Sequence, residues 1–420
     1  MSAGSLRRAF WLGLLAGGVY FAGTLYWITH VMTVYGGVQT WLAVPINLAL
    51  VAFLALFPAL FALVVRRLTV AHGPNALVAA PFVWAATELG RTHLFGGFPW
   101  VLLGYSQVTV LPIAQLASLL GVYGVSTLVA AVSAALALAV RRRYLPIATT
   151  LAVVLAVAVW GHRRVAASEL TRAGDPVRVG MVQGNIDQGI KWQPALASQI
   201  FDDYVRMTRQ AIAGGAQLVL WPESSTPFMY EEDPFGAARL RAVVQQSHVA
   251  LLFGSDQIAW KTVSGRRVPD RYFNSAFLLN PDGSTAGVYR KLHLVPFGEY
   301  VPLQKLLFFA APLTDQIGTF TPGDRAVLLP VDGHPLSVSI CYEVVYPALV
   351  REFVRGGSEL LTTITNDAWF GDTSAPVQHF LRLGLVLPEI GRGGARLEAG
   401  QFVFGAGGFK DSSADPQRAC

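Results

Sequence analysis

Apolar residues dominate the first 160 positions, and shorter apolar runs separated by polar segments follow. From Ala9 to Val65 the chain contains no Asp, Glu, Lys or Arg. A helix needs about 20 apolar residues to cross a bilayer, so this stretch can hold two spans, broken near Tyr35-Gly36-Gly37. The pattern predicts five membrane spans, at 9–29, 41–65, 75–91, 116–140 and 144–161. Glu88 and Arg91 crowd the end of the third. The first could also be a secretory signal, but its apolar core exceeds the usual 7–15 residues.

The second half of the chain has a different pattern of apolar and polar residues. Short β-branched runs alternate with polar, helix-like stretches after Gly161. Asn280-Pro281-Asp282-Gly283 reads as a hairpin turn between two of the runs. Alternating strands and helices indicate an α/β domain. The predicted strands are 177–182, 218–221, 250–253, 273–279, 285–289, 337–340 and 360–364, and the predicted helices are 195–213, 235–247 and one between the last two strands. The expected domains are therefore a transmembrane domain at 1–162 and an α/β domain at 175–380.

Charge separates the two halves as clearly as hydrophobicity does. Residues 1–160 carry eight Arg, no Lys and one acid, a net charge of +7, whereas residues 161–420 carry 24 bases and 25 acids. A nucleic-acid partner would need a basic face on the polar half, so this class is excluded. Arginine-rich short loops stay in the cytoplasm. With five spans, Arg7/Arg8, Arg66/Arg67 and Arg141–Arg143 lie inside, and everything after Gly161 lies outside.

Three polar residues stand where apolar runs end: Glu223 after Leu218–Trp221, Lys291 after Thr285–Tyr289, and Cys341 after Ser337–Ile340. The only other cysteine is the last residue, which makes a structural disulfide an unattractive explanation for Cys341. A thiol is mostly protonated at neutral pH and needs a base to become a nucleophile. A carboxylate can take that proton, and an ammonium group can stabilise the oxyanion formed from an attacked carbonyl. Such a set needs no cofactor, and no zinc-like Cys/His spacing is present.

Each of these residues also has a plainer explanation. A lone buried Cys is commonly a small hydrophobic residue. Glu223 could be an acid at a helix N-terminus, and Lys291 a solvated surface charge. Glu299 and Glu343 could form surface ion pairs. Catalysis is favoured because all of these residues occur together, each within a longer segment that resembles one family.

The longer segments resemble those of the bacterial apolipoprotein N-acyltransferases, an integral membrane family of the nitrilase superfamily. The similarity extends over roughly residues 10–380, whereas a soluble amidase would share only the Glu-Lys-Cys order. The segments that carry it are Gly97-Phe98-Pro99-Trp100, Gly104-Tyr105-Ser106-Gln107, Met181-Val182-Gln183-Gly184-Asn185, Lys191-Trp192, Trp221-Pro222-Glu223-Ser224, His293 to Pro302, Ile340-Cys341-Tyr342-Glu343, Asn366-Asp367-Ala368-Trp369-Phe370-Gly371 and Gln378-His379.

This resemblance implies an α/β nitrilase-like αββα sandwich behind a multi-pass helical domain, in the bacterial cytoplasmic (inner) membrane and on its periplasmic side. A phospholipid, typically phosphatidylethanolamine, would donate an acyl chain to a thiol. The thioester would then acylate the N-terminal diacylglyceryl-cysteine of an apolipoprotein. The implied roles are nucleophile for Cys341, general base for Glu223, oxyanion stabiliser for Lys291, support of the site for Glu299 and Glu343, and a place near the acyl chain or its entrance for Trp192 and Tyr342.

Two alternatives remain open at this stage: a membrane-tethered carbon–nitrogen hydrolase, and an inactive protein that only binds lipid. The chain also departs from the family pattern. About two further spans usually precede the first one here, and after His379 the similarity ends in a Gly-rich stretch without a final span. We therefore expect residues 381–420 to form an atypical, disordered tail. An incomplete sandwich of this kind is expected to be poorly stable or inactive.

Overall fold

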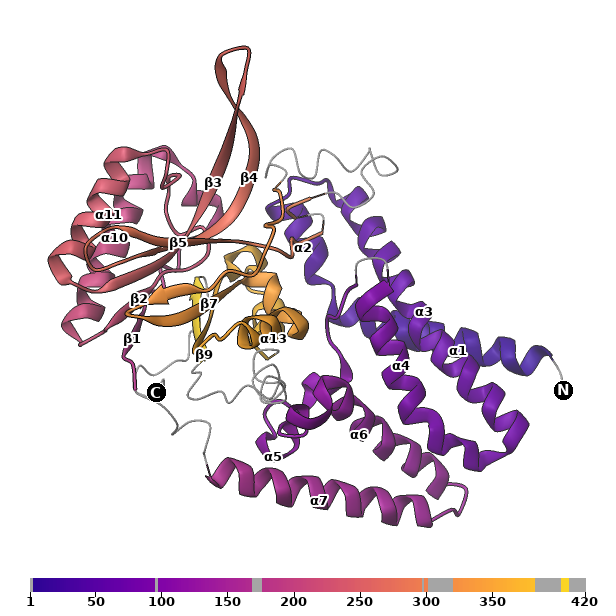
Figure 1. The fold of residues 1–420 in the computed structure, drawn as a ribbon. Coiled ribbons are helices and arrows are strands. Elements are labelled where there is room, and N and C mark those ends of the chain that lie inside the picture. Colours follow the sequence, from indigo (N-terminus) through magenta and orange to yellow (C-terminus); the bar gives the residue numbers. More distant parts are fainter. Residues whose placement is uncertain are drawn as a thin grey trace.

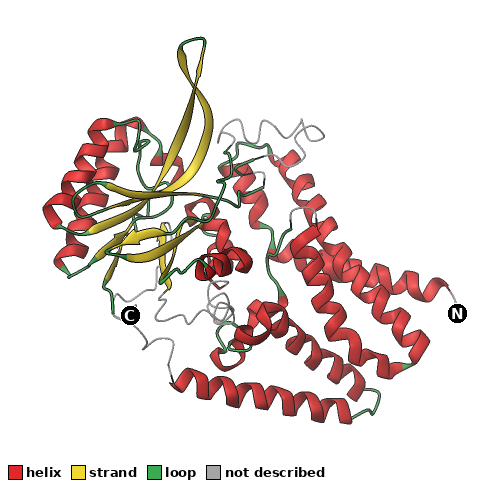
Figure 2. Ribbon diagram, viewed as in Figure 1, coloured by secondary structure: helices red, strands yellow, loops and turns green. Residues whose placement is uncertain are grey.

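A computed structural model of the chain describes residues 3–94, 97–167, 176–296, 298–300, 320–381 and 402–407. One half consists of long helices, and the other contains two sheets with helices packed on them (Figures 1 and 2). The boundary coincides with the change in hydrophobic pattern along the sequence, because the last long apolar helix ends at Ala167 and the first strand begins at Val179.

The helical half folds back on itself several times (Figure 1). Helix α1 packs closely along α3, since a Cβ at Gly13 would lie only 2.6 Å from the peptide oxygen of Pro58. The elements of this half are α1 (Ala3–Thr24), α2 (Trp27–Val34), α3 (Thr40–His72), η1 (Pro74–Ala79), α4 (Ala80–His93), η3 (Leu103–Gln107), α5 (Leu111–Ala114), α6 (Ala117–Ala139) and α7 (Leu145–Ala167).

Within the described residues, three helices are long and apolar enough to cross a membrane: α3, α6 and α7. A fourth candidate is the pair formed by residues Ser5–Thr24 and α2, which are bent by 47° at their junction. The predicted span at 75–91 corresponds to η1 followed by α4. Helix α4 has only 14 residues, fewer than the roughly 20 that a bilayer requires, so this prediction lacks support from helix length.

The first sheet has the strand order β1-β2-β3-β4-β5. Strands β1, β2 and β3 run parallel, and β4 and β5 are antiparallel neighbours, as the predicted hairpin turn requires. Alternate residues along the strands face opposite sides. Val219 and Leu251 therefore pack under the outer helices, whereas Leu218 and Leu252 face the second sheet. The bounds are β1 (Val179–Met181), β2 (Leu218–Leu220), β3 (Ala250–Val263), β4 (Arg266–Leu279) and β5 (Thr285–Arg290).

The second sheet has the order β6-β7-β8-β9, with β7, β8 and β9 parallel. Helices α10 and α11 cover the outer face of the first sheet, and α13 packs against the core between the sheets, with Phe353 on Tyr289. The elements are α9 (Gln188–Lys191), α10 (Pro194–Ala213), α11 (Pro234–Ser247), β6 (Leu329–Val331), β7 (His334–Ile340), η5 (Cys341–Val345), α13 (Pro347–Arg355), β8 (Leu360–Asn366), η6 (Asp367–Phe370) and β9 (Phe402–Gly407). This is the nitrilase-like α/β architecture that the resemblance implied.

Two features differ from the predictions. Strands β3 and β4 continue far past 250–253 and 273–279 and form a ribbon that projects from the body (Figure 1). In addition, the stretch expected to be a disordered tail contains β9, which pairs in parallel with β8 from Leu361 to Asn366. The expectation of a tail without structure is therefore wrong for residues 402–407. Apart from Leu381, the rest of that tail lies outside the described residues.

The two halves meet in a continuous apolar cluster. Phe21, Leu25 and Trp27 of the helical half pack with Tyr342 and Val345 of η5, the short helix that begins at Cys341. The indole nitrogens of Trp27 and Trp100 both donate to Gln378 Oε1, at 3.2 and 2.7 Å. The helical half therefore touches the segment that carries the candidate nucleophile.

Candidate active site

The predicted site residues come together because their strands end at the same edge of the sheets. Strand β2 leads to Glu223, β7 leads to Cys341, and Lys291 follows β5. Carboxyl ends of neighbouring parallel strands are the usual location of sites in such sheets. Gly254 allows the loop after β2 to approach closely, since a Cβ there would lie 2.6 Å from the peptide oxygen of Pro222.

A closed network of charged groups forms the centre of the site. Lys291 Nζ lies 3.1 Å from Glu223 Oε1 and 2.9 Å from Glu299 Oε1. Asn274 Nδ2 donates to the same two oxygens, at 2.7 and 2.9 Å. The remaining oxygen of Glu223 accepts from the backbone N–H of Asn366 at 3.0 Å. All five residues are buried, so both carboxylates are fixed in position by several donors.

The pKa directions follow from this network. Burial alone would raise the pKa of Glu223, but Lys291 and the Asn274 hydrogen bond hold it below its ordinary value. Burial would lower the pKa of Lys291, but the charges of Glu223 and Glu299 raise it well above its ordinary value. At neutral pH the pair is therefore a carboxylate and an ammonium group, the charge states required of a base and an oxyanion stabiliser.

Cys341 sits buried in a strained turn directly after β7. Its φ is 51°, in the left-handed region that non-glycine residues seldom adopt. Burial raises the pKa of its thiol well above the ordinary value, Glu223 raises it further, and Lys291 opposes both effects. The resting group is thus a thiol, and its attack on a carbonyl requires a base to take its proton.

Glu343 supports the turn from the inside. Its Oε2 accepts from the backbone N–H of Ile340 at 2.7 Å, and its Oε1 accepts from Tyr289 and the N–H of Leu292, at 2.7 and 2.6 Å. Burial raises the pKa of Glu343 to about 7, although these donors act against the rise. The carboxyl group links the nucleophile turn to the segment that carries Lys291, which is a structural role and not that of a surface ion pair.

Two aromatic residues named from the resemblance lie in different environments. Tyr342 is buried and its ring stacks on that of Trp100 from the helical half, with centroids 6.4 Å apart. Trp192 is 47% exposed. Its ring lies 5.6 Å from Nζ of the buried Lys191, whose own Nζ approaches the peptide oxygen of Glu223 at 3.4 Å. Trp192 is thus connected to the site through one side chain.

Some residues of the site were not assigned a role from the sequence. Asn274 lies inside a predicted strand, and the apolar pattern of that strand does not indicate that its amide connects two carboxylates. Asn366 and Lys191 lie in the segments that resemble the family, which was the available signal. Lys191 is buried and is held against the loop of Glu223, and burial lowers its pKa to about 8.

One group in the described part of the chain has metal-ligating atoms close together. The ligand atoms of Cys341, Asp367 and His379 lie within 4.8 Å of one another. The atoms of the last two are engaged within the protein, because His379 Nδ1 lies 3.0 Å from Asp367 Oδ1 and Nε2 lies 3.2 Å from the peptide oxygen of Cys341. The group therefore serves as a hydrogen-bonded support beside the nucleophile.

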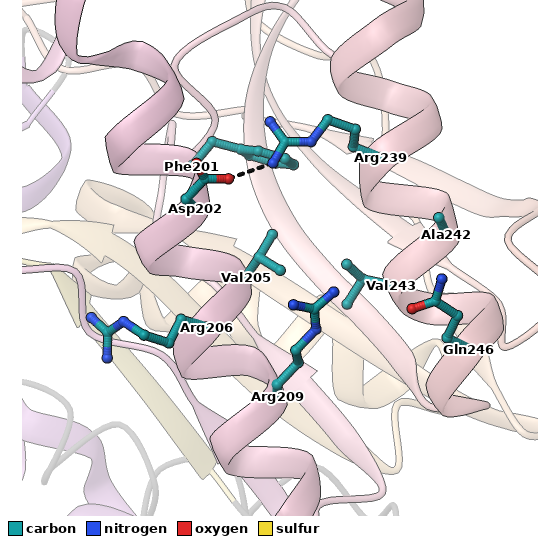
Figure 3. Close-up of a pocket in the computed structure, with 9 residues that line it drawn as sticks. All are labelled: Phe201, Asp202, Val205, Arg206, Arg209, Arg239, Ala242, Val243 and Gln246. Carbon is teal, nitrogen blue, oxygen red and sulfur yellow. Dashed lines mark hydrogen bonds and ion pairs between the residues drawn. The ribbon is translucent and has the colours of Figure 1, made fainter.

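A separate pocket opens between α10 and α11 (Figure 3). Asp202 and Arg239 form an ion pair at one end of it, and Arg206 and Arg209 lie toward the other. None of the predicted site residues lines this pocket. Its lining residues are Phe201, Asp202, Val205, Arg206, Arg209, Arg239, Ala242, Val243 and Gln246.

The fold and the Glu–Lys–Cys site place the second half of the chain among the carbon–nitrogen hydrolases of the nitrilase superfamily. Residues 178–383 match the family model described as carbon-nitrogen hydrolase, and residues 1–135 match that of the apolipoprotein N-acyltransferase N-terminal domain. The chain belongs to the apolipoprotein N-acyltransferase family.

Relatives over most of the chain carry that name. The apolipoprotein N-acyltransferase of Geobacter metallireducens is 40% identical over 383 residues, covering 89% of this chain and 72% of that protein. That of Allorhizobium ampelinum is 34% identical over 395 residues, covering 92% and 73%. Among solved structures, a carbon-nitrogen hydrolase from Helicobacter pylori G27 matches with a TM-score of 0.36 and 21% identity, over 51% of this chain and 68% of that one.

Proposed function

We propose that the protein acylates the N-terminus of apolipoproteins, using a phospholipid as acyl donor and Cys341 as the carrier of the acyl chain. The observation that carries this proposal is the buried Glu223–Lys291–Glu299 network beside a thiol whose turn is packed against membrane helices. In this proposal a lipid acyl chain approaches the thiol from the side of the helical half. The proposed domains are 1–162 for membrane anchoring and 175–380 for catalysis.

In the first half-reaction, Glu223 takes the proton of the Cys341 thiol, and the sulfur attacks an ester carbonyl of the phospholipid. Negative charge develops on the carbonyl oxygen and is stabilised by the Lys291 ammonium group. When the C–O bond breaks, the leaving lysophospholipid oxygen takes the proton back from Glu223. The products are a Cys341 thioester and a lysophospholipid.

In the second half-reaction, the free α-amine of the diacylglyceryl-cysteine attacks the thioester carbonyl. Glu223 accepts a proton from the attacking nitrogen, and Lys291 again stabilises the oxyanion. The C–S bond breaks, the thiolate is reprotonated, and an amide is released. In this scheme Glu299 and Asn274 keep Lys291 and Glu223 in place, Glu343 holds the turn of Cys341, and Trp192 and Tyr342 line the approach of the acyl chain.

Phosphatidylethanolamine is the proposed donor, and the proposed location is the bacterial inner membrane with the catalytic half on the periplasmic side. Arg66 Nε donates to Ser5 Oγ at 2.9 Å, so the arginines that begin α1 and end α3 lie together. The α6–α7 turn with Arg141–Arg143 lies at the same end of the helices, away from the sheets (Figure 1). Arginine-rich ends face the cytoplasm, which supports this orientation.

The orientation is tested with single cysteines in a background of Cys341→Ser and Cys420→Ser. A reagent that does not cross the membrane should label Ala167→Cys in intact spheroplasts and leave Thr69→Cys unlabelled. The reverse pattern would contradict the proposed location.

The activity is tested with purified protein, phosphatidylethanolamine labelled in its acyl chain and a diacylated lipopeptide with a free N-terminus. Transfer of label to the lipopeptide amine supports the proposal. Release of the label as free fatty acid indicates a hydrolase, and absence of any labelled product indicates an inactive lipid-binding protein.

A further inference from the structure

We propose that His379 is a positioning residue for Cys341, holding the nucleophile's own peptide oxygen in place. This inference rests on the proposed role of Cys341 as nucleophile. His379 Nε2 lies 3.2 Å from the peptide oxygen of Cys341. A carbonyl oxygen can only accept, so Nε2 donates the hydrogen of this bond, and because a carboxylate also only accepts, Nδ1 donates a second hydrogen to Asp367. The hydrogen bond of the ring is made to the backbone of Cys341, and we therefore assign His379 a positioning role.

The histidine is itself held from behind. Its Nδ1 lies 3.0 Å from Asp367 Oδ1, and that oxygen also accepts from Thr365 Oγ1 at 2.7 Å. The three side chains are almost completely buried, with His379 and Asp367 each 1% exposed. A chain of hydrogen bonds therefore runs from the end of β8 through η6 to the nucleophile turn, which ties Cys341 to the neighbouring strand.

The turn of Cys341 requires such support. A non-glycine residue at φ 51° is strained and persists only when its surroundings hold it. Glu343 Oε2 fixes the N–H of Ile340 on one side of the residue, and His379 fixes the oxygen of Cys341 on the other. Without the second bond the oxygen of Cys341 loses its buried side-chain donor, and we expect the sulfur to lose its alignment with Glu223 and Lys291.

The helical half fixes the orientation of the histidine ring. The ring of Trp100 stacks on that of His379, with centroids 5.9 Å apart and planes 19° apart. Gln378, the preceding residue, accepts from the indoles of both Trp27 and Trp100. The orientation of the nucleophile thus depends on contacts from the helical half, which a soluble member of the superfamily would have to replace.

Two substitutions separate the two hydrogen bonds of His379. His379→Gln places an amide nitrogen near the position of Nε2 and keeps the bond to Cys341, while His379→Asn places one near Nδ1 and keeps the bond to Asp367. Each variant loses one buried hydrogen bond, so their melting temperatures should fall by similar amounts. The rate of Cys341 thioester formation should stay within about threefold for His379→Gln and fall at least about tenfold for His379→Asn, with KM for the phospholipid unchanged.

The measurement uses the full chain in detergent micelles with labelled phosphatidylethanolamine and no acceptor. Equal losses in both variants, or a larger loss in His379→Gln, would overturn the proposal. If His379→Asn does not fold, a tenfold or larger loss in His379→Gln alone still overturns it, and a rate near that of the wild type supports it. Cys341→Ser is measured in parallel: label retained there would overturn the proposed function itself, independently of His379.

Discussion

Both halves of the molecule bury charged side chains, but they use them for different purposes. In the helical half, Arg91 donates to the peptide oxygens of Phe98 and Trp100, at 3.4 and 2.6 Å, and Glu88 accepts from the N–H of Leu103 at 2.7 Å. These charged groups form hydrogen bonds with backbone groups of one loop. In the catalytic half, Lys291 bridges Glu223 and Glu299, so the charged side chains pair with one another.

The difference indicates what each group contributes. A buried charge that satisfies backbone oxygens fixes the shape of a loop, here the loop that presents Trp100 to Tyr342 and His379. A closed set of opposite charges beside a thiol instead prepares a base and an oxyanion site. Breaking the first should mainly lower stability, and breaking the second should mainly lower the rate of the chemical step.

Among substitutions of the charged groups, the largest effect is expected for Lys291→Met. Removing one stabiliser of an oxyanion typically costs about 10²–10³ in rate, and here it also leaves two buried carboxylates without their partner. We expect thioester formation to fall by at least that factor. The matched control is Lys261→Met on the exposed ribbon, where Lys261 pairs with Asp270 at 2.7 Å and activity should not change. A loss of less than tenfold in Lys291→Met would contradict the assigned role.

Arg91→Met should have a smaller effect on rate and a clear effect on stability. Two peptide oxygens lose their buried donor, at a cost of about 1–3 kcal/mol for an unsatisfied group. We expect a lower melting temperature in detergent and a loss of activity below about tenfold. Arg143→Met, at an exposed position, is the control. An unchanged melting temperature together with a large loss of activity would show that Arg91 acts in the chemical step and not in stability.

Glu343→Gln tests the support of the nucleophile turn through pH. Burial raises the folded-state pKa of Glu343 from 4.5 to about 7. The stability that this group contributes is therefore complete below about pH 4.5 and is lost as the pH rises through about 7. The melting temperature of the wild type minus that of the variant should fall between pH 5 and pH 8. The exposed Glu352→Gln serves as control, and a difference that grows with pH would show that the carboxyl is stabilised as its anion.

The smallest effect is expected for Trp192→Ala. This half-exposed ring contacts Lys191 and not the charged network itself among the interactions of the described residues, so we expect the charges around Cys341 to remain in place. We expect KM for the phospholipid to rise several-fold, with the maximal rate reduced less. Trp260→Ala on the ribbon is the control. A fall in the maximal rate at unchanged KM would place Trp192 in the chemical step and not in lipid binding.

The parts of the fold predicted best are those governed by local pattern. Helices α10 and α11 and strands β2 and β5 begin and end within a residue of the predicted positions. The ribbon formed by β3 and β4 was missed beyond their buried parts, because its outer residues are largely exposed and show no apolar alternation. Strand β9 was missed because its pairing partner, β8, lies about 40 positions earlier in the chain.

The candidate site shows the same limit. Strand ends and the family resemblance located Glu223, Lys291 and Cys341, which the structure brings to one edge. Asn274 gave no signal, because its function as a bridge between two acids arises only when β4 meets the loop of Glu223. The bond from His379 to the oxygen of Cys341 joins residues 38 positions apart, a contact that no local pattern encodes.

The most direct measurement of the central claim is the intact mass of the protein after incubation with phosphatidylethanolamine in the absence of an acceptor. The proposed mechanism predicts a mass increase of one acyl chain, located on Cys341 by peptide mapping, removed by hydroxylamine and absent in Cys341→Ser. Cys420→Ser should acquire the same adduct as the wild type. An adduct on any other residue, or one that persists in Cys341→Ser, would contradict the assignment of the nucleophile and the mechanism built on it.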